Sequence, residues 1–398
     1  MKKEYRQLLV FGFLVLFVSG CSSLKSLKRE RSVPDSAISE AEVVGVPGVR
    51  YIFSTKKGLD RFIADFDVHQ RGARPPKPPE KVSFLSISGG GDNGAFAAGL
   101  LSGWTTHGDR PQFKLVTGIS TGALIAPFAF LGSDYDGVLR QVYTGSRPRD
   151  VYKKRGFLTG FFGDSLLDTS PLYELISKHV DEEIIRKIAH EYTVNHRWLL
   201  VATTNLDAQA PIKWNMGKIA AAGTPEAIEL FKKVLLASAS IPGAFPPVMI
   251  DVEVNGKRYQ EMHVDGGASR QAFLYPPALT KRIKSEYPIP DLSREAYIIR
   301  NADFTPEPSE TERFTIAIVL KTVKQLILYQ GMGDLYEMYV TTQQDNVGYN
   351  LAFISNEFDF PHTEEFGQEY MNKLFDYAER KAANGYPWLN EPFGLSIE

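Results

Sequence analysis

The sequence predicts an α/β fold with a mostly parallel central sheet between two layers of helices. Three apolar runs, at residues 82–87, 113–116 and 198–204, have the length and composition of strands that are buried on both faces. Helical segments follow the first two runs, and strands that alternate with helices form parallel sheets covered on both sides. The 398 residues, of which 43% are hydrophobic and 12% aromatic, supply enough apolar side chains for one large core.

The N-terminus has the pattern of an export signal. Lys2, Lys3 and Arg6 precede an apolar run at residues 8–18, which is too short to span a bilayer but suits the core of a signal peptide. The run ends in Val18-Ser19-Gly20-Cys21, which resembles the bacterial lipobox, where the cysteine is lipidated and becomes the first residue of the mature protein. The alternative is a secretory signal that is cut just before a free cysteine.

Cys21 is predicted to carry a lipid anchor. It is the only cysteine of the chain, so it can form no intramolecular disulfide. Two or three acyl chains on one residue hold a protein stably on a membrane. Serines rather than an aspartate follow Cys21, and in lipoproteins of the enteric type this favours the outer membrane over the inner one. We therefore expect a lipid-anchored protein of the bacterial cell envelope, with residues 1–20 as its signal peptide.

Residues 21–80 are expected to form the lipidated tether and an N-terminal extension. Residues 22–42 are polar and predict a flexible tether, residues 58–66 have apolar positions at helical spacing, and residues 75–79 form a proline-rich connector. The formal net charge is −2, and the basic residues are dispersed apart from a few near the anchor. This charge distribution excludes nucleic acid as a partner class, and no feature of the sequence identifies a protein partner.

A glycine-rich loop follows the strand at residues 82–87. It contains Gly89, Gly90, Gly91 and Gly94, and consecutive glycines after a strand expose backbone N–H groups above the sheet. Such groups suit an oxyanion, because they are fixed donors aimed at the charge that develops on a carbonyl oxygen during acyl transfer. The spacing of three of these glycines also matches a dinucleotide-binding loop, but no strand ending in an acidic residue follows about twenty residues later. We predict an oxyanion loop.

Gly118-Ile119-Ser120-Thr121-Gly122 stands between the strand at residues 113–116 and a helical segment at residues 123–131. A serine on a sharp turn from strand to helix is the usual place of a hydrolase nucleophile. The flanking Gly118 and Gly122 allow the backbone to turn tightly, and the N-terminus of the helix points at the hydroxyl. The alternative is an ordinary glycine and serine turn. We predict that Ser120 is a nucleophile.

A serine nucleophile needs a base, and Asp265 is the strongest candidate. It ends an alternating stretch at residues 259–264, and Gly266 and Gly267 follow it. The glycine loop, the serine turn, a segment at residues 237–247 and this aspartate occur in the order found in the patatin-like phospholipases. The chain resembles this family over residues 82–278, and four ordered matches make the resemblance specific.

The resemblance implies a lipid acyl hydrolase in which a serine and an aspartate act as a dyad, with no histidine, metal or cofactor. Ser120 would be the nucleophile, Asp265 the general base, and the glycine loop the oxyanion hole. Asn93 departs from the pattern, because many family members have a lysine or arginine there. An asparagine offers only neutral hydrogen bonds, so a preference for anionic head groups is not expected.

A conventional triad is the main alternative to the dyad. His263 and Asp265 project on the same face of a strand, so His263 could stand near the site. His362 follows a proline in a late loop and is the other possible base. The apolar, glycine-containing segment at residues 152–167 is either a mobile lid that binds acyl chains or part of the core.

The predicted organisation is a patatin-like catalytic core at residues 81–290 and a C-terminal helical extension at residues 291–398 packed on it. The predicted activity is that of a membrane-tethered phospholipase A or esterase that acts on lipid acyl esters. A thioesterase or short-chain esterase is the alternative with the same chemistry. A non-catalytic envelope lipoprotein that keeps the fold as a binding module is the alternative from another class.

Overall fold

The sheet of the computed structural model is parallel at its centre and antiparallel at one end. The structure describes residues 29–72, 81–156, 164–280, 293–304, 310–313 and 315–394. In these ranges ten strands form one sheet in the order β1-β9-β10-β7-β4-β3-β11-β12, and β8 pairs with both β7 and β2. The parallel strands are β7 (Trp198–Asn205), β4 (Phe113–Gly118), β3 (Lys81–Ile87), β11 (Ser293–Arg300) and β12 (Gly348–Phe353). The antiparallel strands are β10 (Lys257–Asp265), β9 (Val248–Val254), β1 (Glu42–Val43), β8 (Ala210–Asn215) and β2 (Arg50–Tyr51).

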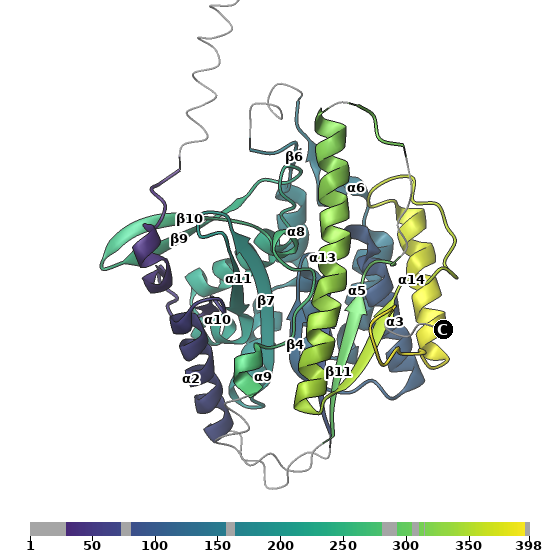
Figure 1. Ribbon diagram of the computed structural model, residues 1–398, viewed down its shortest axis with the longest axis horizontal. Coiled ribbons are helices and arrows are strands. Elements are labelled where there is room, and N and C mark those ends of the chain that lie inside the picture. Colours follow the sequence, from purple (N-terminus) through teal and green to yellow (C-terminus); the bar gives the residue numbers. More distant parts are fainter. Residues whose placement is uncertain are drawn as a thin grey trace, which may run out of the picture.

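Helices cover both faces of this sheet, as the alternation of strands and helices predicts. The larger core joins one face to α3 (Gly94–His107), α4 (Thr121–Leu131), α5 (Asp136–Gly145), α6 (Pro148–Val151), α8 (Ser170–His179), α9 (Glu182–Thr193), α10 (Met216–Ala222), α11 (Pro225–Ser238) and α14 (Gln368–Ala383). Two smaller cores join the opposite face to α2 (Lys56–Gly72) and α13 (Thr315–Asp345). Figure 1 shows α13 lying along the front of the sheet. The three-layer α/β/α fold is confirmed.

The C-terminal region is part of the sheet, so the predicted boundary at residue 290 does not separate two structural units. β11 lies between β3 and β12, with Ile299 opposite Ile87, and both its neighbours run parallel to it. α14 packs closely on α3, because Gly99 and Gly103 leave room for its backbone, and a methyl group at either would clash with the carbonyl oxygens of Phe375 or Glu379. The extension therefore completes the fold instead of capping it.

The N-terminal extension is also bound to the sheet from the first described residues onward. Arg29 forms an ion pair of 2.7 Å with Asp207, and the carbonyl of Arg31 accepts a hydrogen bond from the N–H of Gln260. Val33 is buried in the larger core. The flexible tether expected at residues 22–42 is therefore wrong over its described part, because its few apolar side chains find a place in the core. The predicted helix at residues 58–66 is confirmed as part of α2.

Several sequence predictions lie outside the described residues. They are the signal peptide with Cys21, the proline-rich connector at residues 75–79, and residues 157–163 of the apolar segment. The flanks of that segment pair as β5 (Lys153–Lys154) and β6 (Leu167–Asp168). In the described part of the chain, no helix combines the length and the hydropathy that crossing a membrane requires.

Candidate active site

Ser120 lies at a strained turn between β4 and α4. Its backbone has φ 55° and ψ −126°, a conformation that residues with a side chain rarely adopt. The turn is tight enough that a methyl group on Gly118 would clash with the carbonyl oxygen of Gly122, and one on Gly122 would clash with that of Ile87. The two glycines are therefore required, and they place the serine beyond the end of its strand.

Ser120 and Asp265 are hydrogen-bonded, although 145 positions separate them in the sequence. The serine Oγ donates to Asp265 Oδ2 at 2.6 Å, and both side chains are buried. Asp265 is the last residue of β10, where it stands opposite Thr203 of β7. Its other carboxylate oxygen accepts from the N–H of Gly267 at 2.7 Å. Gly266 lets this loop pass close to the carbonyl oxygen of Ala202.

The environment of Asp265 raises its affinity for a proton. Burial raises the pKa of Asp265 to about 7, because water is removed from around the carboxylate, while the hydrogen bonds from Ser120 and Gly267 act in the opposite direction. A base with a pKa near neutral is well matched to a proton transfer at physiological pH. The carboxylate is therefore both close enough and basic enough to accept the hydroxyl proton of Ser120.

The four predicted oxyanion donors do not have equal roles. The N–H of Gly89 donates to the carbonyl of Gln271 at 3.1 Å, and the N–H of Gly94 is used within the turn, where it reaches the carbonyl of Gly91. The N–H groups of Gly89 and Gly94 therefore already have partners, whereas an oxyanion needs donors that are free. The N–H groups of Gly90 and Gly91 donate to no acceptor in the described ranges, and both residues have positive φ.

Gly94 has a packing role. A methyl group there would lie 2.6 Å from Cε1 of Tyr143 and would also clash with the hydroxyl of Thr121. The absence of a side chain therefore lets the start of α3 rest against the start of α4. This contact holds the glycine loop beside the turn that carries Ser120.

Three residues that the sequence predictions did not single out support the site. Asn301, at the end of β11, bonds Ser88 O with its side-chain amide at 2.9 Å and accepts from the N–H of Ala97, so it holds both sides of the glycine loop. Ser238 Oγ accepts from the N–H of Ser120 at 3.0 Å. The side-chain amide of Gln271 donates to the carbonyl of Gly267 at 2.8 Å. No local motif marks these residues: Asn301 and Ser238 act across more than one hundred positions, and the bond of Gln271 to Gly267 spans four positions within a loop.

Neither histidine proposed for a triad contacts the serine or the aspartate. The imidazole of His263 is fully buried and bonds Thr203 Oγ1 at 2.9 Å and Glu261 at 3.1 Å. Burial lowers the pKa of His263. His362 bonds Asp92 Oδ2 at 2.8 Å. The two-residue spacing places His263 on the same strand as Asp265, but its ring is held by other groups.

The loop that carries Asn93 is hydrogen-bonded to the start of α14 and to the segment before it. Asp92 Oδ2 accepts from His362 and from the N–H of Phe366, each at 2.8 Å, and Tyr370 donates to Asn93 Oδ1 at 2.6 Å. Asp92, His362 and Glu365 place one potential metal-ligating atom each within 4.8 Å of one another. The contact between Asp92 and His362 has the length of a direct hydrogen bond. Asp92 and His362 therefore help to hold the glycine loop in place.

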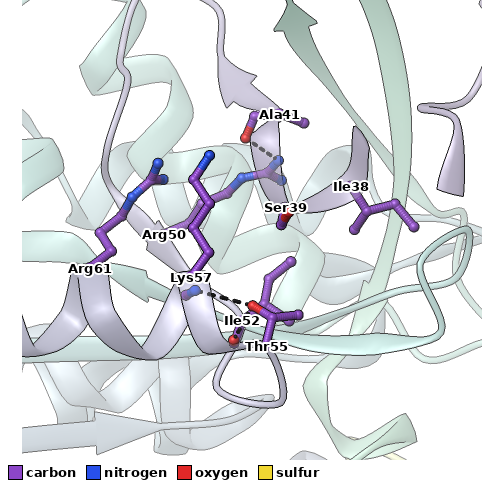
Figure 2. Close-up of a pocket in the computed structure, with 9 residues that line it drawn as sticks. Ile38, Ser39, Ala41, Arg50, Ile52, Thr55, Lys57 and Arg61 are labelled. Carbon is purple, nitrogen blue, oxygen red and sulfur yellow. Dashed lines mark hydrogen bonds between the residues drawn. The ribbon is translucent and has the colours of Figure 1, made fainter. Parts of the chain in front are cut away.

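A small pocket elsewhere in the molecule has no catalytic features. It lies between the 3₁₀ helix Asp35–Glu40 and the start of α2, and its lining includes Arg50, Lys57 and Arg61 (Figure 2). These cations are paired with Glu261, Glu40 and Glu42, respectively. Its charges are therefore balanced within the protein, and it contains no nucleophile and base pair.

The family comparison agrees with the position of this site. Residues 85–277 match the family model described as patatin-like phospholipase, a range that includes the glycine loop, Ser120 and Asp265. No curated protein matches the sequence significantly. Among solved structures, the chain is similar to VipD from Legionella pneumophila, with 12% identity and a TM-score of 0.36 over 77% of this chain and 67% of that one.

Proposed function

The chain carries a patatin-like phospholipase domain at residues 85–277, and we propose that it hydrolyses carboxylic esters of lipids with a dyad of Ser120 and Asp265. The observation that carries this proposal is the 2.6 Å hydrogen bond between the serine Oγ and the aspartate Oδ2. The family supports a lipid acyl hydrolase in general. The dyad, the ester class of the substrate and the membrane tether are our own inferences.

The reaction begins when Ser120 Oγ attacks the ester carbonyl carbon while its proton moves to Asp265 Oδ2. The carbonyl oxygen becomes an oxyanion, which the free N–H groups of Gly90 and Gly91 stabilise. The tetrahedral intermediate then collapses, and the proton on Asp265 passes to the departing alcohol oxygen. This leaves an acyl group esterified to Ser120.

The second half of the reaction repeats these steps with water. Asp265, again a carboxylate, accepts a proton from a water molecule as its oxygen attacks the acyl carbon. The second oxyanion collapses, the proton returns to Ser120 Oγ, and the fatty acid departs. The hydrogen bond from Gly267 to Asp265 keeps one carboxylate oxygen oriented while the other exchanges protons.

A fluorophosphonate probe tests this proposal, because only a serine with a working base and oxyanion hole reacts with it quickly. Labelling of the detergent-solubilised full chain that disappears in Ser120→Ala is the expected result. A folded wild-type protein that neither reacts with the probe nor hydrolyses any ester or thioester would instead favour the non-catalytic binding module. Comparison of an ester and a thioester with the same acyl chain separates the two enzymatic alternatives.

We also propose that Cys21 anchors the protein in the bacterial cell envelope, with the outer membrane as the favoured location. The support is the sequence pattern before Cys21, which lies outside the described residues. Cys21→Ala should leave the detergent phase or remain as uncleaved precursor. Wild-type protein that stays on the membrane without an acyl group at Cys21, detected by mass spectrometry, would contradict the anchor.

The uncharged Asn93 suggests a substrate selectivity. Its side-chain oxygen accepts from Tyr370, and its amide can offer only neutral hydrogen bonds to a head group. We expect neutral esters and zwitterionic phospholipids to be hydrolysed at least as well as anionic ones of equal chain length. Asn93→Arg should raise the relative turnover of anionic lipids, and added salt should reduce the gain. A wild-type preference for anionic lipids that Asn93→Arg does not change would contradict this role.

A further inference from the structure

The first half of α13 exposes large hydrophobic side chains to solvent. Seven described side chains between residues 318 and 329 are exposed, and none of the seven carries a charge. Five of them are large hydrophobic residues, with the exposed fractions Ile318 50%, Val323 46%, Leu326 65%, Ile327 39% and Tyr329 58%. A surface helix normally turns charged residues outward, so a contiguous apolar face of this kind indicates a contact with something other than water.

The second half of the same helix is docked in the usual way. Leu335 and Met338 are buried in one of the smaller cores, and Glu337 faces outward, where it pairs with Arg270.

The exposed hydrophobic side chains of the first half cover a wide face. With 100° between successive residues, these five side chains spread over roughly half of the helix circumference. The apolar face is therefore a property of residues 318–329 and not of the whole helix.

This apolar face begins beside the candidate active site. The side-chain amide of Gln330 donates to the carbonyl of Ser269, and Asp334 Oδ2 accepts from the N–H of Gln271 at 2.6 Å. Ser269 and Gln271 both belong to the loop that starts at Asp265. From Gln330 back to Ile318 the helix extends about 18 Å, at about 1.5 Å per residue. α13 thus links the loop of Asp265 directly to the apolar surface.

Other exposed hydrophobic side chains lie near the same loop. Ile241 is 36% exposed and follows Ser240, whose carbonyl accepts from the N–H of Asp265. Leu166 is 57% exposed and is bonded through its N–H to Gly243. In Figure 1 the first half of α13 projects toward the upper end of the view, and the first described residues, in purple, lie toward that end too.

We propose that residues 318–329 of α13 lie in the head-group region of a phospholipid bilayer and hold the site of Ser120 and Asp265 against the membrane surface. The inference rests on the proposed function, because a lipid acyl hydrolase must receive its substrate from a bilayer. Apolar helix faces bind at this boundary with their side chains about 5–10 Å deep.

The area of the apolar face favours a bilayer over a second copy of the chain. Five partly exposed side chains on one helix offer on the order of 500 Å², whereas a stable protein interface buries about 800 Å² on each partner. A bilayer needs no shape complementarity, so a small convex surface is sufficient. Among the described side chains of residues 318–329, Thr322 and Gln325 are the exposed polar ones and Lys321 is half-buried. Uncharged polar side chains are compatible with the head-group region, and a lysine can extend its ammonium group toward the water.

Depth-dependent fluorescence quenching tests the position of the helix. Leu326→Trp places a reporter on the apolar face, and Val340→Trp, on a 51% exposed position of the docked half, is the matched control. Both are made in the full chain with Ser120→Ala, reconstituted into vesicles of phosphatidylethanolamine and phosphatidylglycerol that contain brominated acyl chains. Each variant adds one tryptophan to the four native ones, and the emission of the parent protein is subtracted. The remaining emission of Leu326→Trp should be quenched at least about twofold more than that of Val340→Trp. Equal quenching of the two would overturn the proposal.

Activity measurements on two substrates provide a second test that does not depend on tryptophan. The variant Leu326→Gln/Tyr329→Gln should hydrolyse vesicle phospholipids at least about tenfold more slowly, since each side chain loses the transfer of a large apolar group. Its turnover of a monomeric short-chain ester should stay within about twofold of the wild type, as should both activities of Val340→Gln. An unchanged vesicle activity of the double variant would overturn the proposal.

The remaining outcomes separate this inference from the proposed function. If Leu326→Trp is quenched but the wild type hydrolyses no ester, the proposed hydrolase activity is rejected, and the proposed contact of residues 318–329 with the bilayer is supported. Light scattering could instead show that the wild type is a dimer and that Leu326→Gln/Tyr329→Gln is a monomer. Together with equal quenching at positions 326 and 340, this would identify the face as an interface between two copies. That result would overturn the bilayer as its partner.

Discussion

Replacement of Asp265 by asparagine should make the protein more stable while it removes the base. Asparagine has nearly the shape of aspartate, so its side-chain oxygen can accept from the N–H of Gly267 and its amide can donate to Ser120 Oγ. The hydrogen-bonded geometry is then retained. What disappears is the energetic cost of a buried negative charge that has no cation beside it.

The magnitude follows from the pKa of the carboxyl group. Burial raises the pKa of Asp265 from 3.8 to about 7, so the folded protein holds a proton that the unfolded chain releases between about pH 4 and 7. The free energy of unfolding of the wild type therefore falls as pH rises through this window. About three pKa units correspond to about 4 kcal/mol, and this loss is complete above pH 7. Asp265→Asn, neutral at every pH, should not show it.

Chemical denaturation at several pH values measures the effect. The free energy of unfolding of Asp265→Asn minus that of the wild type should increase by up to about 4 kcal/mol between pH 4 and pH 8. Asp109→Asn, at a side chain that is 65% exposed, is the control for removal of a carboxylate from the surface. Ester hydrolysis by Asp265→Asn should fall by several orders of magnitude at the same time.

Two results would refute this reasoning. If the difference between Asp265→Asn and the wild type were the same at pH 4 and pH 8, the carboxyl group would not be desolvated in the folded state. If the variant were more stable at high pH but still hydrolysed esters at nearly the wild-type rate, Asp265 would be a buried acid with no part in the chemistry.

Three further outcomes test the same site. The kcat/KM for a soluble ester should rise with pH through an ionisation near 7, because Asp265 must lose its proton before it can accept one from Ser120, and a rise centred near pH 4 would contradict this. His263→Gln should keep most of the activity that Ser120→Ala loses, since the ring bonds Thr203 and Glu261. Near-complete inactivation of a folded His263→Gln, with Asp265→Asn mild, would point to a triad. Gly94→Ala should lower the free energy of unfolding by about 1–3 kcal/mol, because the added methyl group meets Tyr143, and a thermal melt identical to the wild type would contradict the packing role.

The sequence by itself determined the features that depend on neighbouring residues. Buried strands appear as short apolar runs, and a helix start appears where Thr224 caps α11 through a bond to the N–H of Ala227, followed by a proline. The turn at Ser120 is readable because Gly118 and Gly122 are needed within two residues of it. Such signals are local, so no knowledge of the fold is required to recognise them.

The partner of Ser120 came from a resemblance and not from spacing. Asp265 lies on a strand antiparallel to β7, and only the order of strands in the sheet brings its carboxylate to 2.6 Å from the serine. The histidines illustrate the limit of the argument from spacing. His263 shares a strand with Asp265, yet buried Thr203 and Glu261 engage both ring nitrogens.

The tertiary structure alone decided which amides of the glycine loop are free. Gln271 occupies the N–H of Gly89, the turn itself occupies that of Gly94, and Asn301 holds the loop from a strand more than two hundred positions away. It also decided that the C-terminal region completes the sheet, and that half of α13 is left with its apolar side chains in solvent. A hydrophobic pattern indicates that a helix face is stabilised by burial, but only the packed fold shows whether the protein itself covers that face.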